Sequence, residues 1–180
     1  SSTQSAIVVP KPGDANLYYI FTVGSNQTNT GLNYSIVDMT ENLGLGAVTS
    51  KNTNLIPRCA EKISAVVKDC NTKSIWVITL ANSSGTATNP LNTFYAFEIN
   101  QTGVNPTPVK STLSLNISDS RGYLKLSPSG AKLACANVQS GLYLFDFDSN
   151  TGVVSNPLQL PINSVNNKPY GVEFSPNSEL

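Results

Sequence analysis

One pattern of residues occurs twice in this chain, about fifty residues apart. Gly141–Pro157 reads GLYLFDFDSNTGVVSNP, and Asn92–Pro108 reads NTFYAFEINQTGVNPTP. In both stretches aromatic residues alternate with acidic ones, a Thr-Gly turn follows, and a proline-containing extended run comes next. Tyr95, Phe97 and Ile99 share one face of such a strand. A repeat at this distance indicates that one supersecondary unit has been copied along the chain.

Aligning the rest of the chain with this pattern gives four copies of the unit. Each copy begins with a predicted strand that ends in a turn signal; these strands are Ser5–Gly13, Lys62–Cys70, Gly122–Gly130 and Gly171–Ser178. A second strand and an aromatic third strand follow in the first three copies, and a weaker, proline-containing fourth strand suits the edge of a sheet. The predicted units are residues 5–56, 62–116 and 122–163, with the start of a fourth over 170–180.

Four antiparallel strands repeating every 50–60 residues are typical of a propeller blade. We therefore predict an all-β chain, with residues 1–180 forming part of a β-propeller: three four-stranded blades and the first strand of a fourth. Propellers usually have four to eight blades, so the remaining blades are expected outside this sequence. A β-sandwich is the alternative, but it does not require the same turn chemistry in each copy.

The composition limits the functions that this chain can have. Its 180 residues carry 11 basic and 11 acidic side chains, so no basic field is available to attract nucleic acid. No run of about twenty apolar residues could span a membrane, and no signal segment opens the sequence. Histidine is absent. A Ser-His-Asp or Cys-His catalytic mechanism is therefore excluded.

Neither a cofactor nor a metal is expected from the sequence. Cys59 and Cys70 would lie beyond opposite ends of one strand, too far apart for a disulfide, and Cys135 is expected to be a core residue. Asp146 and Asp148, with Asn150, could bind calcium, but the run lacks the glycine and distal glutamate of a calcium loop. We favour the other interpretation, in which Asp146 faces solvent and Asp148 caps the following turn.

Several motifs in order resemble one protein family. The segments GLNYSIVDMTENLGLGAVT, EKISAVVKDCNTKSIWVIT, GYLKLSPSGAKLA and YGVEFSPNSEL are similar to the propeller region of gliding-motility-associated bacterial surface proteins that carry a type IX secretion sorting domain. The resemblance covers nearly the whole chain and implies a secreted or cell-surface location. It brings no catalytic residues. FSPNSEL and LFDFDSNTGVVS also resemble lactonase-type propeller repeats, a likeness that bears on fold and not on reaction.

Ligand contacts are expected on the loops at one end of the blades. In a four-stranded antiparallel blade, the connections between blades emerge at the same end as those between second and third strands. Charged and amide side chains gather there: Arg58, Glu61, Asp119, Arg121, Asn166 and Lys168. Such a mixed ring suits a polar partner, a glycan or a protein, although solvated loops would look the same in sequence.

Predictions can also be made for four other side chains. Asp38 falls on the apolar face of its strand, and we expect a buried carboxylate that accepts hydrogen bonds from the turn at Thr40. Lys125 and Glu173 occupy equivalent positions in successive innermost strands, where they either line a central channel or pair across blades. Trp76 is expected in the core.

The sequence therefore favours a non-catalytic propeller module that binds a polar ligand or serves adhesion at a bacterial surface. One alternative is a propeller hydrolase or lyase acting on a carbohydrate or lactone, with acids or a lysine as its catalytic groups. A purely structural spacer is the other.

Overall fold

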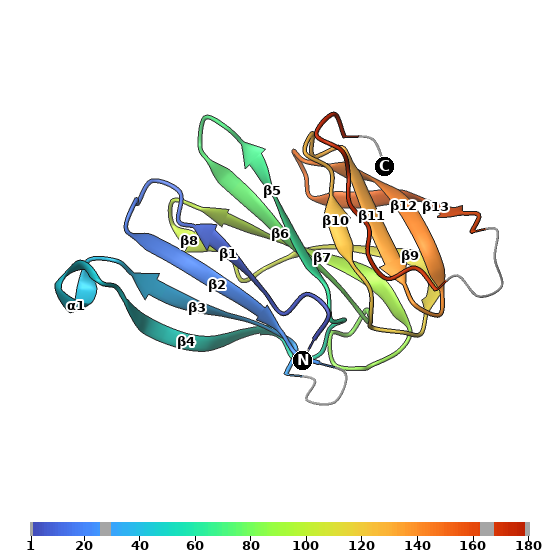
Figure 1. The fold of residues 1–180 in the computed structure, drawn as a ribbon, viewed down its shortest axis with the longest axis horizontal. Coiled ribbons are helices and arrows are strands. Elements are labelled where there is room, and N and C mark those ends of the chain that lie inside the picture. Colours follow the sequence, from blue (N-terminus) through green and yellow to red (C-terminus); the bar gives the residue numbers. More distant parts are fainter. Residues whose placement is uncertain (1, 26–29, 163–167, 179–180) are drawn as a thin grey trace.

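The computed structural model describes residues 2–25, 30–162 and 168–178. These residues form three antiparallel sheets, with a single short helical turn. In the first and third sheets the strands are hydrogen-bonded in chain order, and in the middle sheet the last strand pairs with the third instead of the fourth. Figure 1 shows the sheets side by side, in blue, green and orange from the N-terminal to the C-terminal one. The predicted all-β class and the three four-stranded antiparallel units are confirmed.

The first sheet contains β1 to β4 and the short turn α1 (Glu41–Gly44), which joins its last two strands. Its strands are β1 (Ala6–Pro10), β2 (Leu17–Val23), β3 (Leu32–Asp38) and β4 (Ala47–Ile56). The third sheet has the same simple order. Its strands are β10 (Leu124–Leu126), β11 (Lys132–Asn137), β12 (Gly141–Asp148) and β13 (Val153–Leu160).

The middle sheet differs in one respect from the predicted unit. Its strands are β5 (Ile63–Asp69), β6 (Ser74–Ala81), β7 (Leu91–Asn100), β8 (Gly103–Val104) and β9 (Val109–Ile117). Both β8 and β9 pair with β7, so the predicted fourth strand is divided into two pieces. The interruption follows from Pro106 and Pro108, because proline cannot donate a ladder hydrogen bond.

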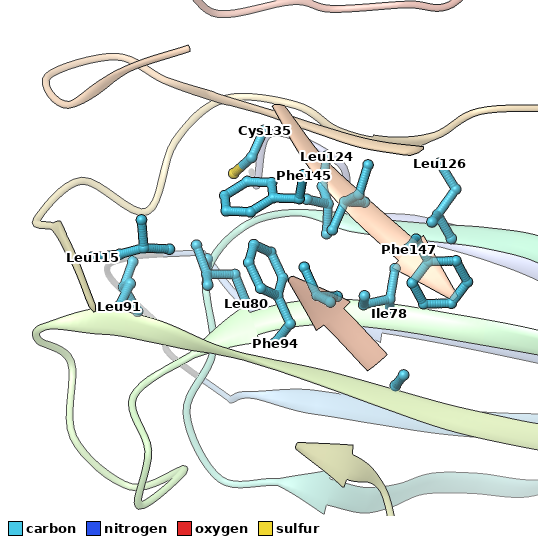
Figure 2. Close-up of a cluster of buried hydrophobic side chains, with 14 of the residues drawn as sticks. Ile78, Leu80, Leu91, Phe94, Leu115, Leu124, Leu126, Cys135, Phe145 and Phe147 are labelled. Atoms are coloured by element: carbon cyan, nitrogen blue, oxygen red, sulfur yellow. The ribbon is translucent and has the colours of Figure 1, made fainter. Parts of the chain in front are cut away.

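Both faces of the middle sheet are buried. Trp76, Ile78 and Leu80 of β6 belong to one apolar cluster, which continues into the third sheet through Phe145 and Phe147. Figure 2 shows Phe94 of β7 lying against Phe145 of β12 in this cluster. The alternate residues of β6 and β7 face the first sheet and pack in a second cluster; they include Val77, Ala81, Tyr95, Phe97 and Ile99. Because successive side chains of a strand point to opposite faces, β6 and β7 contribute residues to both apolar clusters.

The repeated aromatic strands occupy matching places. Tyr95, Phe97 and Ile99 of β7 pack toward the first sheet, as Phe145 and Phe147 of β12 pack toward the middle sheet. Each set therefore faces the preceding sheet. The face predicted from the alternation is confirmed. The two similar stretches in the sequence are third strand and turn of consecutive sheets.

The turn that follows β12 supports one of the two interpretations of the acidic run. Asp148 accepts hydrogen bonds from the Asn150 backbone N–H (2.9 Å) and the Thr151 hydroxyl (2.8 Å), which caps the turn. Asp146 instead contacts Lys132 and Asn156 at the surface. Hydrogen bonds from Thr151 and Asn150 hold the pKa of Asp148 below its usual value. Capping is confirmed, and among the described residues no cluster of acidic or cysteine side chains could hold a metal.

Asp38 is placed differently from the prediction. Its carboxylate does accept hydrogen bonds from the Thr40 backbone N–H (2.9 Å) and hydroxyl (2.7 Å), as expected. The side chain is half-exposed, so the expectation of a buried carboxylate was wrong. The physical reason is its position at the last residue of β3, beside the exposed Met39, where the packed face of the sheet has already ended.

The predicted strand Gly171–Ser178 is also wrong, because the structure has no strand there. The Tyr123 backbone N–H donates to the Tyr170 carbonyl (2.7 Å), and the Ser129 N–H donates to the Ser178 side chain (2.9 Å). Between these two points no backbone hydrogen-bond ladder joins the described part of the segment to β10. A ladder is what defines a strand, and β-favouring residues alone do not supply one.

Trp76 and the cysteines behave as expected. The Trp76 side chain is 3% exposed, and its Nε1–H donates to the Ser149 carbonyl (2.7 Å) of the turn after β12. This hydrogen bond joins the middle and third sheets. Cys135 is buried in the core, and all three cysteines are free thiols. Burial raises the pKa of Cys59 to about 12. No helix in the described ranges is long and apolar enough to cross a membrane.

Candidate functional site

The first strands of the three sheets meet at one place. β1 and β10 both contact β5, and the residues that precede these strands come together at one end. A groove of about 360 Å³ lies along the meeting line. Its lining comes from all three sheets and from the segment after them: Gln4, Ile7, Ser64, Tyr123, Lys125 and Glu173.

An ion pair lies in the connection that leads to β10, just before Tyr123 of the groove lining. The Arg121 guanidinium donates to both carboxylate oxygens of Asp119, with Nη2–Oδ2 at 2.7 Å and Nε–Oδ1 at 3.0 Å. The Asp119 side chain is 5% exposed, whereas that of Arg121 is 49% exposed. The buried carboxylate therefore fixes the orientation of a guanidinium that solvent and ligands can still reach.

The protonation of this pair is set by competing effects. Burial tends to raise the pKa of Asp119, but hydrogen bonds from Arg121 and the positive charges of Arg121 and Lys62 together hold it below the usual range. The Asp119 partner in turn raises the pKa of Arg121. Both groups are charged at neutral pH.

A pH-dependent loss of stability follows from this lowered pKa. We expect Asp119→Asn to lower the free energy of unfolding by about 1–2 kcal/mol at neutral pH, because the charged Arg121 loses its counter-charge and keeps only a hydrogen bond to an uncharged amide oxygen. A lowered folded-state pKa stabilises the fold above the unfolded pKa of about 3.9, and this contribution disappears as the pH falls through the folded-state value.

Urea unfolding of both proteins at neutral pH and near pH 3 measures this effect. The difference between wild type and variant should shrink in acid, where the native carboxyl is protonated too. A difference that stays constant or grows in acid would show that the Asp119 charge does not stabilise the fold.

Glu61 joins the first sheet to the connection that precedes β5. It accepts hydrogen bonds from the Thr3 backbone N–H (3.0 Å) and hydroxyl (3.3 Å), and its own backbone N–H donates to the Ser120 carbonyl (3.2 Å). The Glu61 side chain is buried. The Ser120 hydroxyl, between Asp119 and Arg121 in the chain, is buried and has no hydrogen-bond partner among the described residues. A buried hydroxyl without a partner is a place where a water or ligand atom would be stabilising.

The Gln4 side chain links the other two sheets. Its Oε1 accepts from the backbone N–H groups of Ile63 (3.2 Å) and Leu124 (2.8 Å), and its Nε2 donates to the Leu124 carbonyl (3.2 Å). β5 and β10 are the inner edges of their sheets, where backbone groups lack a strand partner. One amide thus satisfies backbone groups of two edges at once.

Two tyrosines lie beside the ion pair. The rings of Tyr123 and Tyr170 are 5.8 Å apart between centroids, and Tyr170 is half-exposed. The Tyr170 hydroxyl donates to the Thr3 hydroxyl (3.4 Å). Exposed aromatic rings next to a charged hydrogen-bond donor are suited to contact a polar ligand that also has an apolar face, as sugars have.

The structure brings three of the six predicted binding residues together. Glu61, Asp119 and Arg121 lie together in the connections before β5 and β10, but none of them is part of the groove lining. Arg58 is exposed in the connection before β5, where its backbone N–H donates to the Gly85 carbonyl (2.9 Å) of the β6–β7 loop. Lys168 lines a separate hollow with Ser140 and Gln159, and Asn166 lies outside the described residues.

Lys125 and Glu173 form an ion pair, with Nζ–Oε2 at 2.6 Å, and both line the groove. The pairing interpretation of these two residues is therefore confirmed. Hydrogen bonding and charge from Lys125 lower the pKa of Glu173.

Several residues of the site were not predicted from the sequence. Thr3 and Gln4 precede the first strand and gave no signal, because their partners are more than fifty residues away. Tyr123 and Tyr170 were assigned only to predicted strands or connections. Lys62 begins the predicted strand Lys62–Cys70, and nothing in that pattern predicts that its side chain is fully buried. The alternation of apolar and polar residues in β5 does not indicate that a lysine beside it is buried.

Comparisons with known proteins add little. No protein-family model matches the sequence, and no curated protein matches it. Among solved structures, the chain is similar to a luciferin-regenerating enzyme, with a TM-score of 0.45 and 16% sequence identity over 85% of this chain and 45% of that chain. The chain thus spans less than half of that protein, and a likeness at this level carries no argument about fold or activity.

Proposed function

We propose that the three sheets are consecutive blades of a β-propeller. Two observations support this arrangement: the first four strands of every sheet are hydrogen-bonded in chain order, and the middle sheet packs one face on each neighbour. The innermost strands β1, β5 and β10 would then line the central axis, and the groove between them would be part of the central channel. A closed ring needs further blades.

We infer that this propeller module binds a polar ligand, a glycan or a protein segment, without chemical conversion. The observation that carries the proposal is the half-exposed Arg121 guanidinium, which the buried Asp119 holds in the connection before β10, close to the half-exposed Tyr170. Preorganised guanidinium groups bind carboxylates, and they also donate to hydroxyl oxygens. The resemblance in sequence to gliding-motility-associated surface proteins supports a role of this module in adhesion at a bacterial surface.

The enzyme alternative gains no support from the groups at this site. Asp119 is already paired with Arg121, and Glu61 accepts from Thr3. Lys62, the one lysine here whose pKa is lowered, chiefly by burial, is fully buried and would not touch a ligand in the groove. A hydrolase or lyase and a structural spacer therefore remain as outcomes that the experiment must separate from binding.

The test uses an array of bacterial and plant oligosaccharides with the 180-residue chain as the probe. Arg121→Ala should reduce binding to the retained sugars by about tenfold or more, since a charged hydrogen bond contributes about 1.5–3 kcal/mol. Lys132→Ala is the matched control, because Lys132 is as exposed as Arg121 and pairs with Asp146 away from the groove. It should bind like the wild type.

Three results would contradict the proposal. Unchanged binding in Arg121→Ala would show that the Arg121 guanidinium does not contact the ligand. Turnover of a bound sugar or of an added lactone would favour the enzyme alternative. A folded wild-type chain that binds no sugar and no surface protein would favour the structural-spacer alternative.

A further inference from the structure

A second cluster of reactive side chains lies inside the molecule, between the middle and third sheets. It consists of Lys62, just before β5, and of Cys135 and Asn137 in β11. All three side chains are 0% exposed. The polar-ligand site described above does not use them, because none of them reaches the groove surface.

The lysine amine points at the asparagine amide. Lys62 Nζ lies 2.7 Å from Asn137 Oδ1, and it also donates to the Ala136 carbonyl (2.9 Å) and approaches the Arg121 carbonyl (3.4 Å). No carboxylate is within ion-pair distance of Nζ in the described residues. A fully buried lysine held by uncharged oxygens is unusual, because an ammonium in such a place loses its hydration without gaining a counter-charge.

The amide is held in one orientation. Asn137 Nδ2 donates to the Cys135 carbonyl (3.1 Å) and the Gly141 carbonyl (3.2 Å), so Oδ1 must face the lysine. The Cys135 thiol donates to the same oxygen (3.5 Å) and lies 3.8 Å from Nζ. A nucleophile, a carbonyl and a proton donor to that carbonyl are therefore assembled in a water-excluded space.

The direction of the Lys62 pKa shift favours the reaction described below. Burial lowers the pKa of Lys62, against the opposing effects of Cys135, Asp119 and Glu61. At a given pH, a larger fraction of this amine is therefore neutral and nucleophilic than for a lysine in water. Of these groups, Glu61 lies in the connection before β5, Asp119 in the connection before β10, and Cys135 in β11.

We propose that Lys62 and Asn137 join in an amide crosslink between the middle and third sheets. The neutral Nζ attacks Asn137 Cγ, a Cγ–Nζ bond forms, the Cγ–Nδ2 bond breaks, and one proton from Nζ leaves on Nδ2 as ammonia. The Cys135 thiol donates to the carbonyl oxygen as negative charge develops and recovers its proton when the carbonyl re-forms. The reaction consumes no oxidant and no other reactant.

The crosslink would tie the start of β5 to the end of β11, which are 75 residues apart in the chain. Force that separates the two sheets would then act on a covalent bond. A module on a cell surface that is pulled through its ligand would gain resistance to unfolding from such a bond, because a crosslink removes conformations of the unfolded chain.

Intact-mass measurement of the folded 180-residue chain tests the proposal. After incubation at alkaline pH, where the amine is neutral, the mass should be lower by the mass of one ammonia, about 17 Da. Proteolysis should yield one branched peptide that contains Lys62 and Asn137. Lys132, an exposed lysine beside Asp146, is the internal control and should be recovered as an unmodified peptide.

Three variants identify the residues that take part in the reaction, so the test does not fail if a single variant does not fold. Lys62→Met and Asn137→Ala should keep their full mass, and Cys135→Ser should slow the conversion by about 100-fold, the effect of losing a general acid. If the folded wild type keeps its full mass and releases Lys62 and Asn137 in separate peptides after long incubation, the crosslink is refuted. An unchanged rate in Cys135→Ser would refute the role given to the thiol.

Discussion

Phe94→Ala should lower the free energy of unfolding by about 3–5 kcal/mol, the usual cost of removing a buried phenylalanine. Phe94 is 1% exposed and meets Phe145 edge-to-face, with ring centroids 4.9 Å apart. The two rings come from different sheets, as Figure 2 shows. Their separation would leave a cavity that neither sheet can close alone, so the loss is expected at the upper part of this range.

Urea unfolding followed by fluorescence of Trp76 measures this effect, because the single tryptophan lies in the same cluster. Leu158→Ala is the control: Leu158 is 56% exposed on β13 and should change stability by less than about 0.5 kcal/mol. A loss below about 1 kcal/mol for Phe94→Ala would mean that the middle and third sheets do not share a core.

Gly122→Ala should be as damaging as the core substitution, for a different reason. Gly122 has φ +115°, and a Cβ there would lie 2.2 Å from the Ala136 carbonyl oxygen. That carbonyl accepts from Lys62 in the buried cluster and cannot easily move. The backbone conformation alone costs an alanine about 1–3 kcal/mol, and the clash adds to it.

Gly44→Ala separates the two contributions. Gly44 also has a positive φ, +85°, but nothing lies within 4 Å of its hypothetical Cβ. Chemical denaturation should therefore show a loss of about 1 kcal/mol for Gly44→Ala and clearly more, about 3 kcal/mol or above, for Gly122→Ala. Equal losses for the two variants would show that the contact with Ala136 is not as tight as described.

The local parts of the fold could be predicted from the sequence because they depend on neighbouring residues. The alternation of Tyr95, Phe97 and Ile99 fixes which residues share a face, and the Asp148 turn depends on side chains two and three positions away. Such features are encoded within a few residues and repeat with the unit. The same reasoning failed at Gly171–Ser178, since a strand also needs a partner with free backbone groups.

The site could be predicted only in part, because it depends on contacts between distant segments. The prediction that Glu61, Asp119 and Arg121 lie at one end came from the topology of an antiparallel unit. Topology does not say that Gln4 bridges Ile63 and Leu124, or that Lys62 turns inward to Asn137. These contacts form only once three sheets have packed, and no local pattern in the sequence records them.

The central claim is that the middle sheet is a shared layer with a core on each face. Amide hydrogen exchange of the 180-residue chain, followed by peptide-resolved mass spectrometry, tests it directly. β6 and β7 should exchange most slowly, through opening of the whole molecule, while the exposed outer strands β4 and β13 exchange much faster. Exchange in β6 and β7 as fast as in β4 and β13 would contradict the claim.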